Sequence, residues 1–477
     1  MIETLPTAGI WMLVTLAFLI IRTGLPVWTL LIGTSSAFAA AGWTLGLIDL
    51  RVLGAISGRT LGLFENDLLQ ALPLYVLVGV LLQRLTLADT LFSSLARLMR
   101  WTGAGTSLAA FGVGALVAPM NGSVASSSAM LARLVAPRLG KSDSAAATAL
   151  ISASSTIGVV VPPSLVLILL GDAMLRAHTE ASNLPGYLLG GQRIINTQDV
   201  FHAALLPAAA VLLLWILVAW WQGRRAESDA TDLALTPRQW LLSVMVLVVT
   251  VLLFIGVFFG KVLAVEAAAT GGLLLLVATL LSRALDRSDW HAVLDDTLGL
   301  TGALLALLVG ATTFSLIFRL FGTDRWITDL VLDSHLTPSA TAALVLLLTA
   351  LCAWVLDAFE MIFVIIPILA PPLIALLGDA QQVAVLLLLV LQLSFLIPPM
   401  GYAVMMARSR SGLANTSVWY ILRGLLPYLV AQCAVTLVVF LAPSTLHQLD
   451  APPERHLAPV SAEDLDQQMR DMGTKSD

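Results

Sequence analysis

The 477-residue sequence has few of the side chains on which enzyme sites depend. It has two cysteines, Cys352 and Cys433, and six scattered histidines, and neither residue type occurs at the spacing of a metal site. The sequence contains no P-loop and no Ser-His-Asp arrangement, so neither ATP hydrolysis nor nucleophilic catalysis is indicated. We therefore predict that the protein is not an enzyme and has no cofactor.

Charged residues are also scarce. They make up 12% of the chain, whereas hydrophobic residues make up 58%. The formal net charge of -5 is spread over the loops without a basic block, which argues against a nucleic-acid partner. Because a soluble core of this size cannot bury so much apolar sequence, we expect an all-α, polytopic protein in a lipid bilayer.

Apolar runs of membrane-spanning length fall into two sets of five. They cover residues 7–21, 26–48, 69–82, 145–170 and 201–221, and then residues 240–259, 262–281, 300–317, 383–406 and 425–442. Each half also contains an apolar stretch with a polar interruption, namely residues 103–137 and 340–376. We expect these two stretches to form re-entrant helical hairpins, with the polar residues at their tips.

A Pro-Pro pair interrupts the fourth run of each set and indicates an internal repeat. Pro162 and Pro398 are 398 − 162 = 236 residues apart, and the same offset relates Asn121 to Asp357. An odd number of crossings in each half makes the second repeat inverted. Lys and Arg are more frequent on the side that becomes cytoplasmic if the N-terminus lies outside, which supports that orientation.

The predicted domain organisation follows from this repeat. It consists of a first repeat, a cytoplasmic linker, a second inverted repeat and a polar tail, at residues 1–222, 223–238, 239–442 and 443–477. The first repeat contains a hairpin, a broken helix and an external polar segment, at residues 103–137, 145–170 and 172–200. The second contains a hairpin and a broken helix, at residues 340–376 and 383–406.

Each Pro-Pro pair is expected to break its helix. Proline has no N–H, so the carbonyls four residues earlier lose their donors; these belong to Gly158, Val159, Ser394 and Phe395. In hydrocarbon such a carbonyl must be met by protein, water or a cation. Breaks at matching positions in two halves indicate the ion or substrate site of a secondary transporter, and the alternative is a pair of kinks packed against neighbouring helices.

Polar residues at the two hairpin tips are the other candidates. Oxygens of Asn121 and Ser123 suit a hard cation such as Na⁺, and N–H groups around Gly122 suit a substrate carboxylate. Asp357 and Glu360 are carboxylates in an apolar run and would share one face of a helix. They are candidate cation ligands or proton carriers. The alternatives are a polar turn at the first tip and a helix cap at the second.

Four short motifs lie at these tips and breaks. They are Gly122-Ser123-Val124-Ala125, the run from Gly158 to Pro162-Pro163-Ser164, Leu356-Asp357 and Ile397-Pro398-Pro399-Met400-Gly401. At these motifs the chain resembles the large membrane subunit of tripartite ATP-independent periplasmic (TRAP) transporters. The stretch before the second break, residues 391–396, is similar to the mannitol/chloroaromatic branch, whose members are linked to 2-oxo acids and other monocarboxylates.

The resemblance implies Na⁺-driven uptake of an organic acid anion across the bacterial inner membrane. It implies an elevator motion of the hairpins and broken helices, and two partners, a small membrane subunit and a periplasmic substrate-binding protein. Together with the tip chemistry, it places cation ligands at Asn121, Ser123, Gly158, Val161, Pro162, Asp357, Ser394, Ile397 and Met400. It places substrate contacts at Gly122, Ser123, Ser164, Asp357 and Glu360.

At one position the chain departs from the family pattern. Ile397 stands where the family usually has Thr, so a hydroxyl expected near a second sodium site is absent. Two other functions fit the same pattern, namely a carboxylate or ion symporter that works alone, and a non-transporting scaffold or channel. Neighbouring genes for a binding protein and a small membrane subunit would favour the TRAP system over both.

Overall fold

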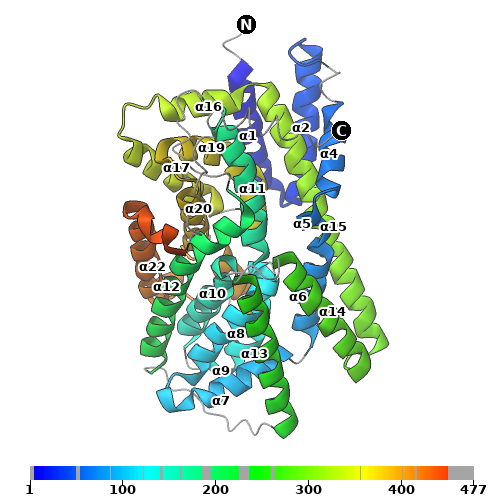
Figure 1. Ribbon diagram of the computed structural model, residues 1–477, viewed down its shortest axis with the longest axis vertical. Coiled ribbons are helices and arrows are strands. Elements are labelled where there is room, and N and C mark those ends of the chain that lie inside the picture. Colours follow the sequence, from blue (N-terminus) through cyan, green and yellow to red (C-terminus); the bar gives the residue numbers. More distant parts are fainter. Residues whose placement is uncertain are drawn as a thin grey trace, which may run out of the picture.

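The computed structural model describes twelve stretches of the chain, namely residues 5–49, 54–85, 87–121, 123–139, 143–161, 164–184, 195–224, 236–258, 264–354, 356–399, 401–413 and 416–449. Every regular element in these stretches is a helix (Figure 1). The first half contains α1 (Leu5–Thr23), α2 (Val27–Thr44), α4 (Ala55–Phe64), α5 (Asp67–Gln70), α6 (Leu72–Arg84), α7 (Leu87–Leu98), η1 (Arg100–Thr102), α8 (Gly105–Asn121), α9 (Val124–Leu139), α10 (Ser144–Val160), α11 (Leu165–Ala181) and α12 (Thr197–Gly223).

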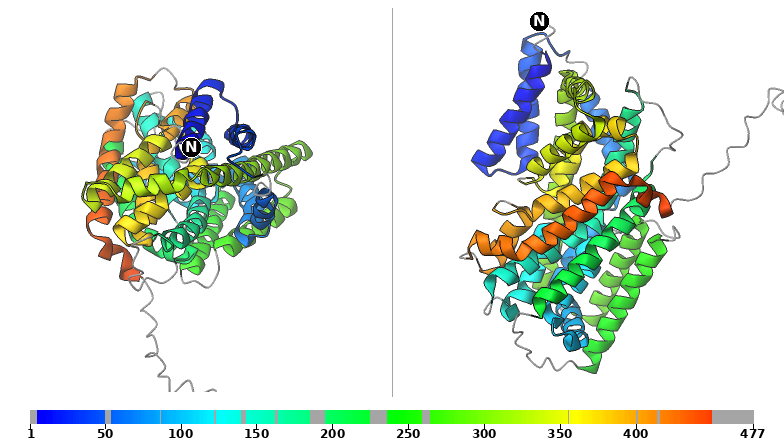
Figure 2. Two further views of the ribbon diagram at one scale, coloured as in Figure 1. Left: turned by 90° about the horizontal axis from the view of Figure 1, so that it is seen from above. Right: turned by 90° about the vertical axis from the view of Figure 1, so that its left-hand side faces the viewer.

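The second half begins with α13 (Pro237–Phe258), α14 (Ala264–Ser282), α15 (Arg287–Leu320), α16 (Thr323–Leu332), α17 (Pro338–Ala353), α18 (Ala358–Glu360) and the π-helical turn η2 (Met361–Ile365). It continues with α19 (Ile366–Leu377), α20 (Ala380–Phe395), α21 (Tyr402–Ser411), α22 (Val418–Leu441) and the 3-10 segment η3 (Pro443–Leu449). Figure 2 shows α1 and α2 projecting at one edge of the molecule, whereas α22 lies along the main body, where it contacts α12.

The helices have the length and composition of a multi-pass membrane protein. Within the described residues, four helical segments are long and apolar enough to cross a membrane, and two bent pairs raise this number to six. The bent pairs are α6 with α7, at 63°, and α10 with α11, at 45°. Fewer helices pass this length test than the ten runs expected from the sequence, because several apolar helices are shorter pieces. The predicted all-α, polytopic class is confirmed.

Helix boundaries recur with the offset of the Pro-Pro pairs. Helices α6 and α15 end at Arg84 and Leu320, and 84 + 236 = 320. Helices α7 and α16 begin at Leu87 and Thr323, and 87 + 236 = 323. The two halves therefore place the same helix ends at equivalent positions.

The helices that lead to the breaks also begin in the same way. Asp143 caps α10 by accepting a hydrogen bond from the Ala146 N–H at 2.8 Å. Asp379, 236 residues later, caps α20 by accepting bonds from the N–H groups of Gln381 and Gln382, both at 3.0 Å. An aspartate oxygen satisfies N–H groups that have no partner within the first turn, so both starts are fixed by the same chemistry.

The two halves point in opposite directions. Figure 1 shows α7, α8 and α9 toward one end of the molecule and their counterparts α16, α17 and α19 toward the other. Gln392 Nε2 donates to the Thr156 carbonyl at 3.3 Å, and these residues are 236 apart. Two equivalent positions can touch only near the axis that relates the repeats. The broken helices therefore meet at the centre of the fold, although the exact domain boundaries stay a prediction.

Each repeat packs its broken helix against the hairpin of the other. Helix α11 lies against α19, and α21 lies against α9. Helix α10 is enclosed by α8, α9, α20, α21 and α22, and its residues 147–160 are all buried. This exchange brings both hairpins and both breaks into one central block.

The segment after the first break is more helical than the sequence predicts. The broken helix was expected to end at residue 170, with a polar segment over residues 172–200, whereas α11 continues to Ala181 and α12 starts at Thr197. The ion pair between Arg176 and Asp172, at 2.7 Å, joins residues four apart and supports the extra turns. The linker between the halves and the polar tail lie largely outside the described residues.

Candidate functional site

The first break separates α10 from α11, and a serine bridges it. Ser164 is buried and caps α11 by accepting a hydrogen bond from the Leu167 N–H at 3.0 Å. Its hydroxyl also donates to the Val159 carbonyl at 3.2 Å. Of the partners expected for the Val159 carbonyl, namely protein, water or a cation, the structure supplies a protein donor, the Ser164 hydroxyl.

The carbonyl of Gly158 is the other one that loses its helical donor at this break. Among the described residues, no hydrogen bond to it is found, and the residue four positions later is Pro162, which has no N–H. Gly158 is buried in the last turn of α10, and the half-buried Val161 follows, with its N–H bonded to the Ile157 carbonyl at 3.0 Å. Pro162 itself lies outside the described residues.

The second break separates α20 from α21. Here too, one of the two carbonyls that lose their helical donors accepts a hydrogen bond from another protein group. The Ser394 carbonyl accepts a bond from the Ile397 N–H at 3.3 Å, and the Ser394 hydroxyl donates to Val390 at 2.8 Å. The Ile397 N–H thus replaces the helical donor that Ser394 was expected to lose, because the chain forms a tight turn after α20, and the role of Ser394 as a cation ligand stays a prediction. The Phe395 carbonyl receives no hydrogen bond from the described residues.

Two carbonyl oxygens converge above Gly401. A Cβ atom built on Gly401 would lie 2.7 Å from the oxygens of both Phe395 and Ile397. The Ile397 oxygen also accepts bonds from the Gly401 N–H at 2.9 Å and from Trp354 Nε1 at 2.7 Å. Closely spaced backbone oxygens are the kind of ligand that a hard cation prefers. The Ile397 side chain, in contrast, is exposed, and Met400 lies outside the described residues.

The second hairpin tip meets this break. The bond from Trp354 to the Ile397 carbonyl joins the end of α17 to the turn after α20. Asp357 and Glu360 form a capping box at the start of α18, in which the Asp357 N–H donates to Glu360 Oε2 at 3.1 Å. Tyr402, the first residue of α21, lies close enough to interact electrostatically with both carboxylates.

One of the two carboxylate oxygens of Asp357 has no hydrogen-bond partner among the described residues. Its side chain accepts a bond from the backbone of Glu360, as the capping alternative requires. Its Oδ1 atom is buried and has no hydrogen-bond partner in the described part of the chain. A buried carboxylate oxygen is costly unless a donor or a cation meets it. Capping therefore accounts for half of this carboxylate and leaves the other half available for a ligand.

The first hairpin tip is less completely described. Asn121 is the last residue of α8, Ser123 is half-buried directly before α9, and the Ser123 carbonyl accepts a bond from the Ser127 N–H at 3.0 Å. Gly122 and the Asn121 side chain lie outside the described residues, so the ligand roles at this tip stay predictions.

The helix that leads to this tip packs against the helix that leads to the first break. Helix α8 approaches α10 so closely that a Cβ on Gly114 would lie 2.5 Å from the Ser154 carbonyl oxygen.

Trp354 and Gly401 were missed as candidate site residues. Trp354 lies two residues before the Leu356-Asp357 motif and Gly401 ends the motif that starts at Ile397, but a tryptophan before a tip and a glycine after a break each have other common roles. The backbone contacts that involve them could not be inferred from the sequence pattern. Helix α20, which leads to the second break, also shares a buried amide pair with α22, in which Gln432 Nε2 donates to Gln392 Oε1 at 2.9 Å.

Ser164→Ala should weaken both the start of α11 and the bridge across the first break. We expect a loss of about 1 to 2 kcal/mol of stability from the cap and the buried bond together. Thermal unfolding of the purified protein would measure it. Asn196→Ala removes the matching cap of α12, far from the breaks. If only Ser164→Ala also changes the Na⁺ dependence of uptake, the bridge serves the ion site; equal effects would make it a cap alone.

Residues 13–445 match the model for the DctM component of tripartite ATP-independent periplasmic transporters. The sialic acid TRAP transporter large permease protein SiaM of Vibrio cholerae is 24% identical over 81% of this chain and 86% of its own length. The 2,3-diketo-L-gulonate TRAP transporter large permease protein YiaN of Escherichia coli is 21% identical, over 89% of this chain and 95% of its own.

A solved structure supports the same fold. The YdaH transporter of Alcanivorax borkumensis superposes with a TM-score of 0.61 at 15% identity, over 84% of this chain and 91% of that one.

These matches confirm the family that the tip and break motifs indicate, whereas the mannitol/chloroaromatic branch stays a prediction. The curated relatives are transporter permease subunits, so the chain is a membrane transport protein and not an enzyme. Because the match to the family model extends over nearly the whole described chain, the protein belongs to the DctM component family of tripartite ATP-independent periplasmic transporters, whose members are large permease subunits.

Proposed function

We propose that this protein is the large subunit of a TRAP transporter that takes up an organic acid anion across the bacterial inner membrane, driven by the Na⁺ gradient. The observation that carries the proposal is the second break, where two carbonyl oxygens converge above Gly401 beside a hairpin tip that holds an unpartnered carboxylate oxygen of Asp357. Permeases named for sialic acid and for 2,3-diketo-L-gulonate support an organic acid as the cargo. The motif similarity at residues 391–396 favours a 2-oxo acid or another monocarboxylate.

Two cation sites are proposed, one at each break. At the first, the open Gly158 carbonyl and the neighbourhood of Val161 and Pro162 would face oxygens of Asn121 and Ser123. At the second, the carbonyls of Phe395 and Ile397 would act with Asp357, while Ser394 and Met400 shape the turn. Ile397 would thus contribute its backbone oxygen by releasing one of its two hydrogen bonds, from the Gly401 N–H or from Trp354, and the missing Thr hydroxyl would reduce the ligand set by one.

The transport motion is proposed from the way the repeats exchange their helices. The hairpins and broken helices pack on each other as one block, which would slide as an elevator against the remaining helices. Backbone N–H groups at Gly122 and the start of α18 would meet the substrate carboxylate, because the N-terminus of a helix favours anions. A small membrane subunit and a periplasmic substrate-binding protein would complete the system.

Reconstitution of the three components in proteoliposomes tests this proposal. The cargo is first identified by thermal-shift screening of carboxylates on the co-encoded binding protein. We expect uptake of that carboxylate only with an inward Na⁺ gradient, and no uptake above background when K⁺ replaces Na⁺. Equal uptake with K⁺, or with a proton gradient alone, would contradict Na⁺ coupling. Full uptake without the binding protein would favour the symporter that works alone.

A further inference from the structure

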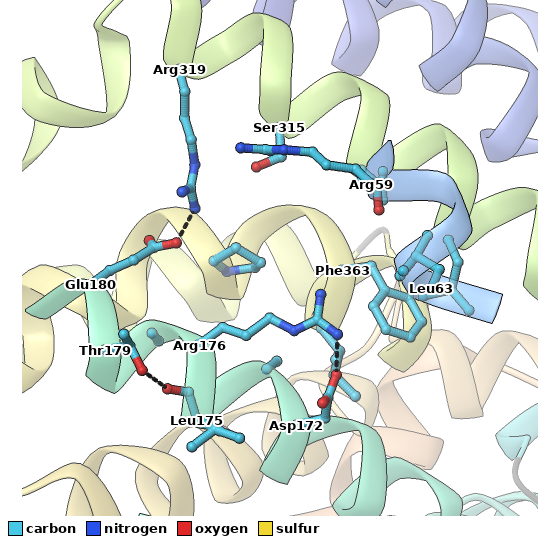
Figure 3. Close-up of a pocket in the computed structure, with 18 residues that line it drawn as sticks. Arg59, Leu63, Asp172, Leu175, Arg176, Thr179, Glu180, Ser315, Arg319 and Phe363 are labelled. Atoms are coloured by element: carbon cyan, nitrogen blue, oxygen red, sulfur yellow. Dashed lines mark hydrogen bonds and ion pairs between the residues drawn. The ribbon is translucent and has the colours of Figure 1, made fainter. Parts of the chain in front are cut away.

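A cavity of about 650 Å³ with charged side chains in its lining lies among α4, α11, α15 and the segment of η2 and α19 that follows the second hairpin tip. Figure 3 shows its lining, with Arg59 extending from α4 toward Ser315 of α15 and Arg319 on the same helix nearby. Arg176 and Glu180 reach the cavity from α11. Asp357, Glu360 and the described residues of the two Pro-Pro breaks do not line the cavity, although Ile362 and Phe363, which follow the second hairpin tip in η2, do.

The cavity carries more positive than negative side chains. Three guanidinium groups, Arg59, Arg176 and Arg319, face two carboxylates, Asp172 and Glu180, which leaves 3 − 2 = 1 positive charge. Arg176 pairs with Asp172 at 2.7 Å, and Arg319 pairs with Glu180. Among the described residues, no carboxylate forms an ion pair with Arg59.

Arg59 and Arg319 lie close enough for their like charges to repel each other, and Glu180 attracts Arg59 less strongly than Arg319 repels it. A single anion between them would relieve that repulsion. Thr312 and Ser315 add hydroxyls, and because residues 312, 315 and 319 are three and four apart they lie on one face of α15. A carboxylate accepts two parallel hydrogen bonds from one guanidinium, so the lining has the donors that such a ligand needs.

We propose that this cavity is a second anion site, which holds a carboxylate between Arg59 and Arg319. The carboxylate replaces Glu180 as the partner of Arg319 and takes the bidentate face of Arg59. Because Glu180 belongs to α11 and Arg319 to α15, an anion bound here loosens the ion pair that joins these two helices. The role of the site as a station for cargo rests on the proposed transport function, whereas anion binding itself does not.

Thiol chemistry at the cavity wall tests the site without any uptake measurement. Cys352 and Cys433 are replaced by Ser, and Ser315→Cys is introduced. The purified protein is treated with methanethiosulfonate reagents that carry either a sulfonate or a trimethylammonium group. The reaction rate of each reagent is divided by its rate with a small free thiol, and we expect this relative rate to be higher for the sulfonate reagent than for the trimethylammonium reagent. Arg59→Gln should lower the ratio of the two relative rates about three- to tenfold, which is the effect of one charge a few ångströms away in a partly solvated site.

Arg325→Gln is the matched control, because it removes an exposed arginine of α16 that does not line the cavity. This variant should leave the preference unchanged. Equal loss in both variants, or no preference at all, would overturn the proposal. If the thiol at position 315 reacts with neither reagent, Thr312→Cys is tested, and lack of reaction at both positions would also overturn it.

Competition by pyruvate then shows whether the cavity binds a carboxylate or only attracts anions through its net positive charge. At equal ionic strength, sodium pyruvate should slow the sulfonate reagent at least about threefold more than sodium chloride does, and Arg59→Gln should abolish the difference. Equal protection by chloride would mean that the cavity has no carboxylate site. Because no transport is measured, failure here is distinguishable from failure of Na⁺-driven uptake.

Discussion

Asp357→Asn should reduce Na⁺-dependent uptake by about tenfold or more, equivalent to at least about 1.4 kcal/mol of lost cation binding. Asparagine has the same shape and is itself a good cap, so the capping box at the start of α18 keeps its geometry. The amide, however, has no charge, and the buried Oδ1 position of Asp357 is the one without a partner in the described residues. The Na⁺ concentration for half-maximal uptake in proteoliposomes measures the effect.

Asp143→Asn is the matched control for this substitution. Asp143 also caps a helix of the central block, but its oxygen accepts from the Ala146 N–H at the far end of α10 from the break. This variant should transport with the Na⁺ dependence of the unmodified protein. If Asp357→Asn transports equally well over the whole range of Na⁺ concentrations, Asp357 is only a cap.

The sequence predicted the repeat because its markers are local and strong. Proline removes an N–H wherever it stands, so the pairs at Pro162 and Pro398 predict broken helices in any packing. The same offset then relates the caps at Asp143 and Asp379, and both cap their helices in the structure. The length of α11 was not predictable, because its last turns depend on a pair of charged residues in a polar stretch.

The sequence predicts which carbonyls lose their helical donors, but not which of them remain available as cation ligands. A proline tells which carbonyls lose their helical donor but not which groups replace it. The Ser164 hydroxyl covers Val159, and the Ile397 N–H covers Ser394, because of how each turn folds after its helix. The Arg59 cavity was beyond sequence reasoning, since its charges come from three helices that are adjacent only in the folded protein.

Gly401→Ala should disable the second break more severely than any change of a single side-chain ligand. The added methyl would lie 2.7 Å from the carbonyl oxygens of Phe395 and Ile397, closer than real Cβ contacts. Both oxygens belong to backbone, so neither can move without shifting the turn. We expect a loss of about 1 to 3 kcal/mol of stability from this overpacking.

Gly401→Ala should also reduce uptake by the protein that remains folded. The methyl occupies the space on which the two carbonyl oxygens converge, so a cation there is displaced rather than merely weakened. Uptake by folded protein should fall about tenfold or more, equivalent to at least about 1.4 kcal/mol. Thermal unfolding and Na⁺-dependent uptake, measured on the same preparation, separate the two effects.

Gly302→Ala is the control, because Gly302 lies within α15 and a Cβ there would meet no atom within 4 Å. Alanine in a helix interior is favoured over glycine by about 0.5 to 1 kcal/mol, so this variant should be at least as stable and should transport normally. If Gly401→Ala is folded and keeps the wild-type Na⁺ dependence, the oxygens above Gly401 do not bind the coupling ion. The first break, with the open Gly158 carbonyl, would then be the better site for Na⁺.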